Sequence, residues 1–358
     1  MSLQFYPLKV SAIQKETKDC VSIAFEIPAD LQEQFTYSAG QYITLKKIIN
    51  GEEVRRSYSL CSSPLENEWR IAVKKVSGGL FSTFANDTLQ VGDVLETMPP
   101  LGKFTFTANE AKAKKYVFFA AGSGITPVLS IIKTILSTEP SATVTLVYGN
   151  KNIGSIIFKE QIEALKNKYT QRLQVIHILS RERTDAALLH GRINQEKCEI
   201  LSNKLIDLTV IDECFICGPE DMILSVRDFL LAKGIDRKKV HVELFTAQKR
   251  NKTTTETITK EDHTPVSKIT VKLDGRSFDF DLALNGNSIL DAALAQGADL
   301  PFACKGGVCC TCKAKVLEGK VSMDVNWGLE QEEIEQGFVL TCQSHPISAS
   351  VVVDFDVK

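Results

Sequence analysis

Residues 5 to about 107 alternate between apolar and polar positions in short runs that turn residues separate. Segments 21–27 and 70–76 show this period of two, which is typical of strands with one buried face. Glycine-containing turns such as Asn50–Gly51 and 77–79 lie between such runs. The pattern predicts a small antiparallel β-barrel.

From Tyr116 onward the pattern changes to continuous apolar runs that alternate with amphipathic segments. Residues 116–121 are wholly apolar, as expected of a strand buried on both faces of a parallel sheet. Apolar residues at 128–136 then recur every three or four positions, with Thr126 placed to cap this helix and Pro127 at its first position. The alternation predicts further strands at 143–148, 173–179, 213–217 and 240–245 and helices at 156–167, 194–206 and 219–233. It indicates a doubly wound α/β sheet.

Residues 249–266 include only two aliphatic side chains and predict a linker, which as a flexible coil would span roughly 20–25 Å. Beyond it, the pattern predicts strands at 268–273, 277–281, 312–317 and 349–355 and a helix at about 288–296. These elements predict a separate α+β module of about 90 residues. We therefore expect three domains, at 1–108, 109–248 and 267–358, with the linker at 249–266.

Composition supports a globular protein of two or three domains. The chain has 358 residues, of which 44% are hydrophobic and 24% charged, and this excludes disordered, collagen-like and coiled-coil classes. A net charge of -2 provides no uniform basic surface for nucleic acid. The charge is uneven, because residues 267–358 hold 8 Lys and Arg against 13 Asp and Glu.

Nothing in the sequence predicts a membrane or secretory location. No apolar stretch reaches the ~20 residues of a membrane helix, and the N-terminal residues lack the charged and apolar regions of a secretory signal. We expect a soluble, cytoplasmic protein whose ten cysteines lie in a reducing compartment.

The densest group of cysteines has the spacing of an iron–sulfur site. Cys304, Cys309 and Cys312 follow a C-x4-C-x2-C pattern, and Cys342 follows further on. This is the plant-type [2Fe-2S] arrangement, and Cys310 is then a spare thiol. Glycines at 306 and 307 allow the loop to wrap closely, so that backbone N–H groups reach the sulfurs.

A structural zinc site is the alternative to the cluster. Such sites usually combine two C-x2-C pairs, and this chain offers one in the loop. A Rieske centre would need two histidine ligands, and the loop has none. The spacing favours [2Fe-2S].

Two segments of the barrel region suit a phosphate-bearing, ring-shaped cofactor. In Arg56–Leu60, alternation places Arg56 and Tyr58 on one face of a strand and Ser57 and Ser59 on the other. A cation, an aromatic plane and hydroxyls are suitable contacts for such a cofactor, although an ordinary strand with a surface arginine is the alternative. Residues 78–83 (GGLFST) place a glycine turn before a helical segment, where phosphate binds readily.

Two segments of the α/β region lie where doubly wound sheets bind nucleotides. Residues 122–127 (GSGITP) form the first strand-to-helix turn, which favours a pyrophosphate although Pro127 replaces the third small residue of the dinucleotide fingerprint. Residues 180–183 (SRER) follow the third strand, and their arginines suit a 2′-phosphate. A plain tight turn and a solvated charge run are the respective alternatives.

Residues 214–217 (CFIC) contain a C-x-x-C pattern that does not predict a redox pair. Residues three apart on a strand point to opposite faces, so the two thiols should diverge. The segment Cys217-Gly218-Pro219 instead ends a strand at the ligand-binding edge of the sheet.

The order of these segments along the chain resembles that of the ferredoxin-NADP reductase family fused to a plant-type ferredoxin. The segments that carry the resemblance are RSYSL, GGLFST, GSGITP, YGN, LSRER, FICGPE, HVELF and the cysteine loop. The segment LLHGRI at 188–193 is similar to the subgroup of reductases that serve phenylacetyl-CoA epoxidases. The resemblance spans nearly the whole chain and implies a β-grasp ferredoxin fold for the C-terminal α+β module.

The resemblance implies a role for each matching residue. Arg56 would bind the flavin diphosphate, Tyr58 would lie against the isoalloxazine, and Ser59 would face its N5. The whole implied set comprises Arg56, Ser57, Tyr58, Ser59, Gly79, Ser82, Thr83 and Phe245 for FAD; Gly122, Gly124, Thr126, Ser180, Arg181, Cys217, Gly218 and Pro219 for the nicotinamide dinucleotide; Ser59, Cys217 and Glu243 for catalysis; and Cys304, Cys309, Cys312 and Cys342 for the cluster. Other fused reductases of this family carry FMN, and the sequence reveals no adenine contact.

The implied activity is electron transfer from NADPH, through FAD and [2Fe-2S], to an oxygenase. A flavin is needed between the two because a hydride carries two electrons and the cluster accepts one at a time. Arg181 and Arg183 favour NADPH over NADH. The expected partner is a di-iron phenylacetyl-CoA epoxidase; the alternatives are another ring-hydroxylating or steroid-degrading oxygenase and, in a different class, a zinc-stabilised binding module without catalysis.

Overall fold

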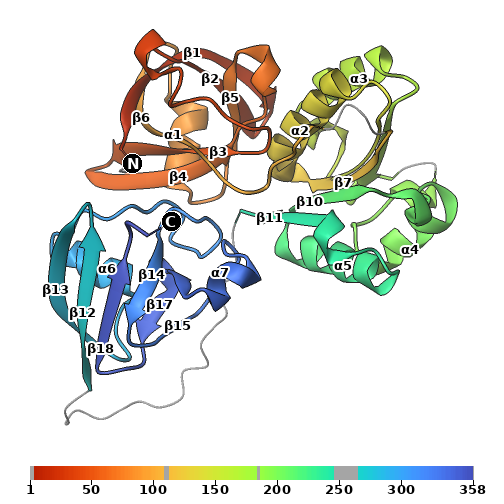
Figure 1. Ribbon diagram of the computed structural model, residues 1–358. Helices are drawn as coiled ribbons and strands as arrows, with labels where there is room; N and C mark the ends of the chain where they lie inside the picture. Colours follow the sequence, from red (N-terminus) through yellow and green to blue (C-terminus); the bar gives the residue numbers. More distant parts are fainter. Residues whose placement is uncertain (1–3, 109–112, 184–185, 246–264, 358) are drawn as a thin grey trace. The chain divides into compact units, whose positions relative to one another are not determined.

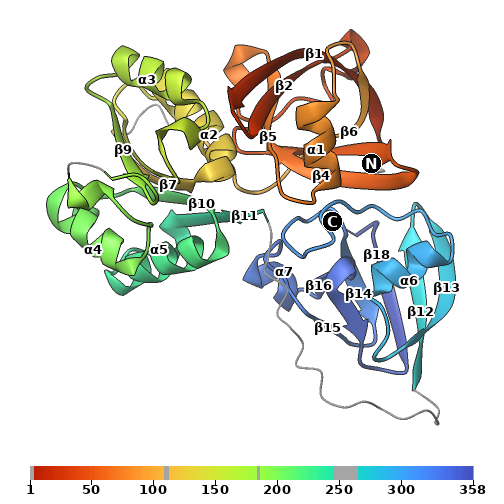
Figure 2. The same cartoon turned by 180° about the vertical axis from the view of Figure 1, so that it is seen from behind.

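The computed structural model describes residues 4–108, 113–183, 186–245 and 265–357 (Figures 1 and 2). They form two compact units, Gln4–Phe245 and a C-terminal unit described from residue 265 on. The linker expected at 249–266 lies outside the described residues except for its last two, and Val266 already begins a strand.

The first part of the larger unit is the predicted antiparallel barrel. Its elements are β1 (Tyr6–Thr17), β2 (Cys20–Glu26), β3 (Tyr42–Ile49), β4 (Glu52–Ser59), β5 (Trp69–Lys74), α1 (Leu80–Asp87) and β6 (Val94–Leu101). The strands pair in the order β4-β3-β6-β1-β2-β5. A further antiparallel bridge between Leu60 and Ile71 joins the end of β4 to β5, which closes the barrel and protects its edge strands. Alternate side chains such as Leu8, Ile23 and Leu45 fill the interior.

The second part of the larger unit is the predicted doubly wound sheet. Its elements are β7 (Lys115–Ala121), α2 (Ile125–Thr138), β8 (Thr143–Asn150), α3 (Lys159–Lys168), β9 (Leu173–Leu179), α4 (Gln195–Lys204), β10 (Glu213–Gly218), α5 (Glu220–Ala232) and β11 (Val240–Leu244). All pairs are parallel, in the order β11-β10-β7-β8-β9. Helices α2 and α3 cover one face, and α4 and α5 the other (Figure 1). The strand order reverses between β7 and β10, which is where such sheets bind ligands.

Helix α2 also joins the sheet to the barrel through a short 3-10 helix, η2 (Pro64–Glu66). The Ser130 hydroxyl donates to the carbonyl oxygen of Ser62 at 2.6 Å. The buried Lys133 ammonium lies 2.9 Å from Glu66 Oε2. Both contacts cross from the α/β sheet to the barrel and hold the two domains of this unit together.

The C-terminal unit has the predicted α+β fold. Its elements are β12 (Val266–Leu273), β13 (Arg276–Ala283), α6 (Ile289–Ala295), β14 (Lys313–Glu318), β15 (Val321–Met323), α7 (Gln331–Glu335), β16 (Phe338–Leu340), β17 (Ser344–Pro346) and β18 (Ser350–Asp354). The main sheet has the order β13-β12-β18-β14-β16, with β12 and β18 parallel. Helix α6 packs its buried side, including Ile289 and Leu290, into the core of this unit.

Three details of the predicted helices are wrong, and the first is that Pro127 is the third residue of α2 and not its first. Thr126 does not cap α2, because a 3-10 turn, η3 (Gly122–Gly124), runs directly into it, and the Thr126 hydroxyl donates to the Ser123 carbonyl from inside the helix. The helix predicted from residue 156 begins at Lys159, since Phe158 adopts a left-handed conformation with φ of 60° and interrupts the turn before it.

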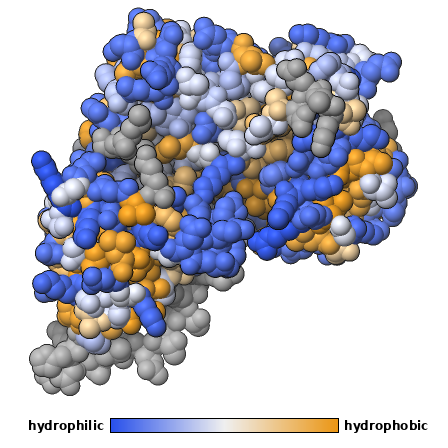
Figure 3. All heavy atoms as spheres, in the orientation of Figure 1, coloured by the Kyte–Doolittle hydropathy of each residue, from blue (hydrophilic) through white to orange (hydrophobic). Residues whose placement is uncertain are grey.

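Among the described residues, no helix combines the length and apolar character required to cross a bilayer. Figure 3 shows one face of the molecule, on which hydrophilic residues dominate and hydrophobic residues gather in smaller groups.

Candidate active site and cluster loop

The three residues expected to take part in catalysis come together although they lie far apart in the sequence. Ser59 is the buried last residue of β4, and its hydroxyl donates to Glu243 Oε2 at 3.3 Å. Glu243 on β11 is the register partner of Cys217 on β10. The site therefore depends on one contact from the barrel to the sheet and one strand pairing within the sheet.

Burial keeps this group of side chains uncharged near neutral pH. It raises the pKa of Glu243 to about 8, against a smaller lowering by the Ser59 hydroxyl. Burial, and next the charge of Glu243, raises the pKa of the Cys217 thiol well above its usual value. Glu243 therefore carries a proton at pH 7 and shares a hydrogen bond with Ser59.

The strand that carries Ser59 presents two of its other residues outward. Arg56 is exposed, and Tyr58 is partly exposed with its ring 5.5 Å from that of Phe81. The Ser57 hydroxyl lies 3.0 Å from the Thr44 hydroxyl on the neighbouring strand β3. Arg56 and Tyr58 are thus accessible to a cofactor, whereas the Ser57 hydroxyl already has a partner within the sheet.

The turn before α1 requires glycine and is organised by Ser82. A Cβ on Gly79 would lie 2.5 Å from Ser82 Oγ. That oxygen accepts the N–H of Val76 and donates to the carbonyl of Gly79. The helix has no side-chain cap at its N-terminus, so the first backbone N–H groups, rather than the Ser82 hydroxyl, are suited to an anion. Thr83 lies one residue further along the helix.

The expected nucleotide turn lies at the point where the strand order reverses. A Cβ on Gly124 would lie 2.2 Å from the carbonyl oxygen of Cys217, so the end of β7 and the end of β10 touch only because this residue is glycine. A Cβ on Gly218 would likewise clash with Met222 at 2.6 Å, and Pro219 caps α5. The predicted residues of the turn and of 217–219 are therefore brought together.

Two lysines near this turn were not predicted from the sequence. The Nζ of Lys74, on the barrel strand β5, lies 3.4 Å from the position of a Cβ on Gly122. Burial, and next the charge of Lys151, lowers the pKa of Lys74. No sequence motif marks either residue, because Lys74 belongs to a different domain from the turn it approaches. Two repelling ammonium groups beside a glycine turn suit an anionic ligand.

The segment predicted to bind a 2′-phosphate lies at the same edge of the sheet. The backbone N–H groups of Ser180 and Arg181 donate to the carbonyls of Asn150 and Lys151 at the end of β8. Arg181 and Arg183 are exposed. Their neighbour Glu182 instead accepts a backbone N–H from residue 153. Phe245, the last described residue of this unit, packs against the core of the sheet.

In the C-terminal unit the four predicted cluster ligands form two pairs. The Sγ atoms of Cys304 and Cys309 lie 3.1 Å apart, and the side chains of Cys312 and Cys342 share a hydrogen bond. Among the residues that the structure describes, no three His, Cys, Asp or Glu side chains gather as a single metal ion would require. Two thiol pairs match the two thiolates that each iron of a [2Fe-2S] cluster requires.

The loop around Cys304 stabilises negative charge on sulfur. The Cys309 thiol, and then the backbone N–H groups of Gly306, Val308 and Cys309, lower the pKa of Cys304 to about 6. The close wrapping needs glycine at 307, which has φ of +71° and where a Cβ would lie 2.7 Å from the Val325 carbonyl oxygen. The loop is therefore built to hold thiolates.

Comparison with known proteins identifies each domain. Residues 7–106 match the oxidoreductase FAD-binding domain, residues 118–228 the oxidoreductase NAD-binding domain, and residues 271–346 the 2Fe-2S iron-sulfur cluster binding domain. The chain is 45% identical to one of the subunits of the 1,2-phenylacetyl-CoA epoxidase from Escherichia coli (strain K12), over 99% of this chain and 98% of the relative. The chain belongs to the ferredoxin-NADP reductase-type family with a fused [2Fe-2S] domain.

Other members of this family share the full domain order. The ferredoxin reductase component of 3-ketosteroid-9-alpha-monooxygenase from Rhodococcus rhodochrous is 34% identical, over 97% of this chain and 96% of the relative. The solved structure of phthalate dioxygenase reductase, at 22% identity and a TM-score of 0.59, covers 98% of both chains and shows the same fold. The family resemblance and the fold class predicted from the sequence are confirmed, and the chain is an oxidoreductase.

Proposed function

We propose that this chain takes electrons from NADPH and passes them, through FAD and a [2Fe-2S] cluster, to an oxygenase of the phenylacetyl-CoA epoxidase type. The observation that carries the proposal is the convergence of Ser59, Glu243 and Cys217 at the switch point of the sheet, in a chain that also provides two cysteine pairs. When bound, flavin accepts a hydride and releases electrons singly, and the cluster takes one electron at a time.

The residues of the chain would bind and orient the two cofactors around this site. Tyr58 would lie against the flavin ring, and the exposed Arg56 would bind its phosphates. Glu243, protonated at neutral pH, and Ser59 would hold a proton at the flavin edge. The glycines at 122, 124 and 218 would let the nicotinamide dinucleotide approach the backbone closely.

A preference for NADPH is supported by three cationic groups at one edge of the sheet. Lys151, Arg181 and Arg183 lie on adjacent, hydrogen-bonded segments, and a 2′-phosphate bound there would gain charge-assisted contacts. The test compares KM for NADPH and for NADH in the wild type and in a variant with both Arg181→Ala and Arg183→Ala. We expect KM for NADPH to rise about tenfold, as for the loss of one charged hydrogen bond, with KM for NADH unchanged.

The matched control for this test is Arg237→Ala. Arg237 is also exposed, but it precedes β11 at the opposite end of the strands, so neither KM should change. A wild-type enzyme that favours NADH, or a double variant that raises both KM values equally, would contradict the proposed preference.

The cluster and the oxygenase are tested separately. Anaerobically purified protein should absorb between about 350 and 550 nm and contain acid-labile sulfide, as flavin and [2Fe-2S] chromophores do; zinc without either chromophore would support the binding-module alternative. The chain should then support NADPH-dependent oxidation of phenylacetyl-CoA by an epoxidase. Turnover only with a steroid monooxygenase, whose reductase is 34% identical, would favour that alternative.

The domain division and location are also proposals. The three family matches support domains at 1–108, 109–248 and 267–358 joined at 249–266. The proposed electron transfer uses NADPH as donor and needs the cluster cysteines as reduced thiols. Both requirements are met inside the cell, which supports a cytoplasmic location. Limited proteolysis should release a fragment of about 90 residues that retains the cluster absorption.

A further inference from the structure

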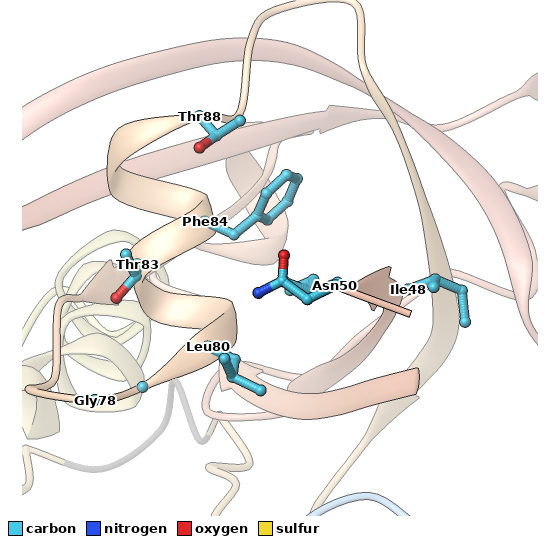
Figure 4. Close-up of a pocket in the computed structure, with 9 residues that line it drawn as sticks. Ile48, Asn50, Gly78, Leu80, Thr83, Phe84 and Thr88 are labelled. Atoms are coloured by element: carbon cyan, nitrogen blue, oxygen red, sulfur yellow. The ribbon is translucent and has the colours of Figure 1, made fainter. Parts of the chain in front are cut away.

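The two cofactor sites proposed above differ in what supports their glycine turns. The turn that includes Gly79 borders an open pocket between the β3–β4 hairpin and α1 (Figure 4). The turn that begins at Gly122 is bonded instead to a side chain of the core. Tyr148 on β8 is fully buried, and its hydroxyl donates to the carbonyl oxygen of Gly122 at 3.0 Å. None of the roles assigned above uses this tyrosine.

The position of Tyr148 in the sheet explains how its hydroxyl reaches the turn. Tyr148 pairs in register with Ala120 on the neighbouring strand β7, and Gly122 follows Ala120 by two residues. The side chain belongs to the hydrophobic core of the α/β sheet, and its hydroxyl is also 3.4 Å from the carbonyl oxygen of Ile157. The contact with Gly122 is therefore made from the interior of the domain.

The Gly122 carbonyl oxygen has both of its lone pairs occupied. It accepts the N–H of Ile125 at the start of α2 as well as the Tyr148 hydroxyl, and a carbonyl oxygen has two lone pairs. Burial raises the pKa of Tyr148 above its usual value, so the hydroxyl keeps its proton and remains a donor. The oxygen is thus held toward the interior, on a glycine with φ of +55°.

The direction of this carbonyl matters for an anionic ligand. A carbonyl oxygen carries partial negative charge and repels a phosphate, whereas the backbone N–H groups at the start of a helix attract one. Neither Ala121 nor Gly124, which precede η3 and α2, caps those N–H groups with a side chain. The Nζ of Lys74 approaches the same turn. With its carbonyl turned inward, the turn offers donors and a cation to a pyrophosphate.

We propose that Tyr148 is a positioning residue of the dinucleotide site: its hydroxyl holds the Gly122 carbonyl toward the core, so that the N–H groups of the turn face the pyrophosphate. The inference rests on the proposed function, in which this turn binds the nicotinamide dinucleotide. Because the pyrophosphate is common to NADPH and NADH, Tyr148 sets the affinity for both nucleotides equally. This separates it from Arg181 and Arg183, which are proposed to contact the 2′-phosphate of NADPH alone.

The test is Tyr148→Phe in the full-length, flavin-loaded protein. It leaves the Gly122 carbonyl without its second donor, so that oxygen is free to turn toward the ligand. With ferricyanide as electron acceptor, we expect KM for NADPH and KM for NADH to rise by the same factor of about ten, as for the loss of one buried hydrogen bond. The kcat should stay within about twofold of the wild-type value. The Kd of NADP+ for the oxidised protein should rise by the same factor as KM.

Tyr116→Phe is the matched control. Tyr116 is also a buried tyrosine of this sheet, but it lies at the opposite end of β7, and its hydroxyl donates to Glu139 Oε2 at 2.9 Å. This variant should lower the free energy of unfolding to a similar extent and change neither KM. Unchanged KM values in Tyr148→Phe, an equal rise in Tyr116→Phe, or a rise for NADPH alone would overturn the inference and leave the proposed function intact. A wild-type flavin that neither NADPH nor NADH reduces would overturn both.

Discussion

The cluster loop and the Ser59 site contrast in how the chain assembles them. Three of the four cluster cysteines come from the single loop 304–312, and their spacing alone identifies the chemistry. Ser59, Cys217 and Glu243 come from three strands, β4, β10 and β11, in two domains. A site within one loop can be derived from spacing, whereas a dispersed site depends on which strands the topology places side by side.

The two sites also treat cysteine in opposite ways. The Cys309 thiol and backbone N–H groups lower the pKa of Cys304 to about 6. Burial near a carboxyl group raises the pKa of Cys217. The first environment favours a metal-binding thiolate, and the second keeps an unreactive thiol at the end of a strand.

The largest expected effect is loss of the cluster from the locally encoded site. Cys304→Ser removes one thiolate of a pair, so acid-labile sulfide and the cluster absorption should be lost, while NADPH still reduces the flavin. Cys310→Ser, in the same loop, is the control and should retain both signals. Loss of the cluster in the control and its retention in Cys304→Ser would mean that the spacing had been assigned to the wrong cysteines.

At the dispersed site, Ser59→Ala should slow hydride transfer without loss of flavin. It removes the hydrogen bond to Glu243, and the loss of a hydrogen bond to a buried polar group corresponds to about 10- to 100-fold in rate. Anaerobic stopped-flow measurement of flavin reduction gives the rate. Ser57→Ala should have a much smaller effect, because the Ser57 hydroxyl bonds to Thr44; equal effects would contradict the assigned geometry.

Gly124→Ala tests the contact that brings β7 and β10 together. The new Cβ would lie 2.2 Å from the Cys217 carbonyl oxygen, so overpacking should lower the free energy of unfolding by about 1–3 kcal/mol and raise KM for NADPH. Denaturant titration measures the first and steady-state kinetics the second. Gly154→Ala, whose Cβ would meet its nearest atom at 3.7 Å, should be neutral, and a neutral Gly124→Ala would refute the close approach.

A further test concerns pH. Because the pKa of Glu243 is about 8 in the folded state against an ordinary value of 4.5, the folded protein holds a proton that the unfolded chain loses within this window. The free energy of unfolding should therefore fall as pH rises from about 4.5 to 8. Glu243→Gln lacks this contribution, so the stability of the wild type relative to the variant should decrease across the window, by about 1.4 kcal/mol for each unit that separates the folded and unfolded pKa values. A constant difference would show that Glu243 has an ordinary pKa.

Long periodic segments made most of the fold predictable. Strand β9 has the predicted bounds of 173–179, and the other α/β elements differ by a few residues at their ends. The short elements β15, α7, β16 and β17 were missed, because three to five residues contain too few positions to show a period.

The candidate site was predictable only where its chemistry is local. The cysteine spacing predicted the four cluster ligands without reference to a fold, whereas their arrangement as two pairs is visible only in the structure. Lys74 was missed because its neighbour Gly122 belongs to another domain. Alternation grouped Ser57 with Ser59, but only the β3–β4 register reveals that Thr44 is the partner of Ser57.

The polar contacts of α2 with the barrel have a consequence for cooperativity. Lys133 is buried and its partner Glu66 is exposed, so removal of Glu66 would leave a buried ammonium without its carboxylate. The cost would be shared by both domains, since the pair spans them. Barrel and sheet should consequently melt together in a single transition. A destabilising substitution in either domain then threatens flavin and nucleotide binding alike.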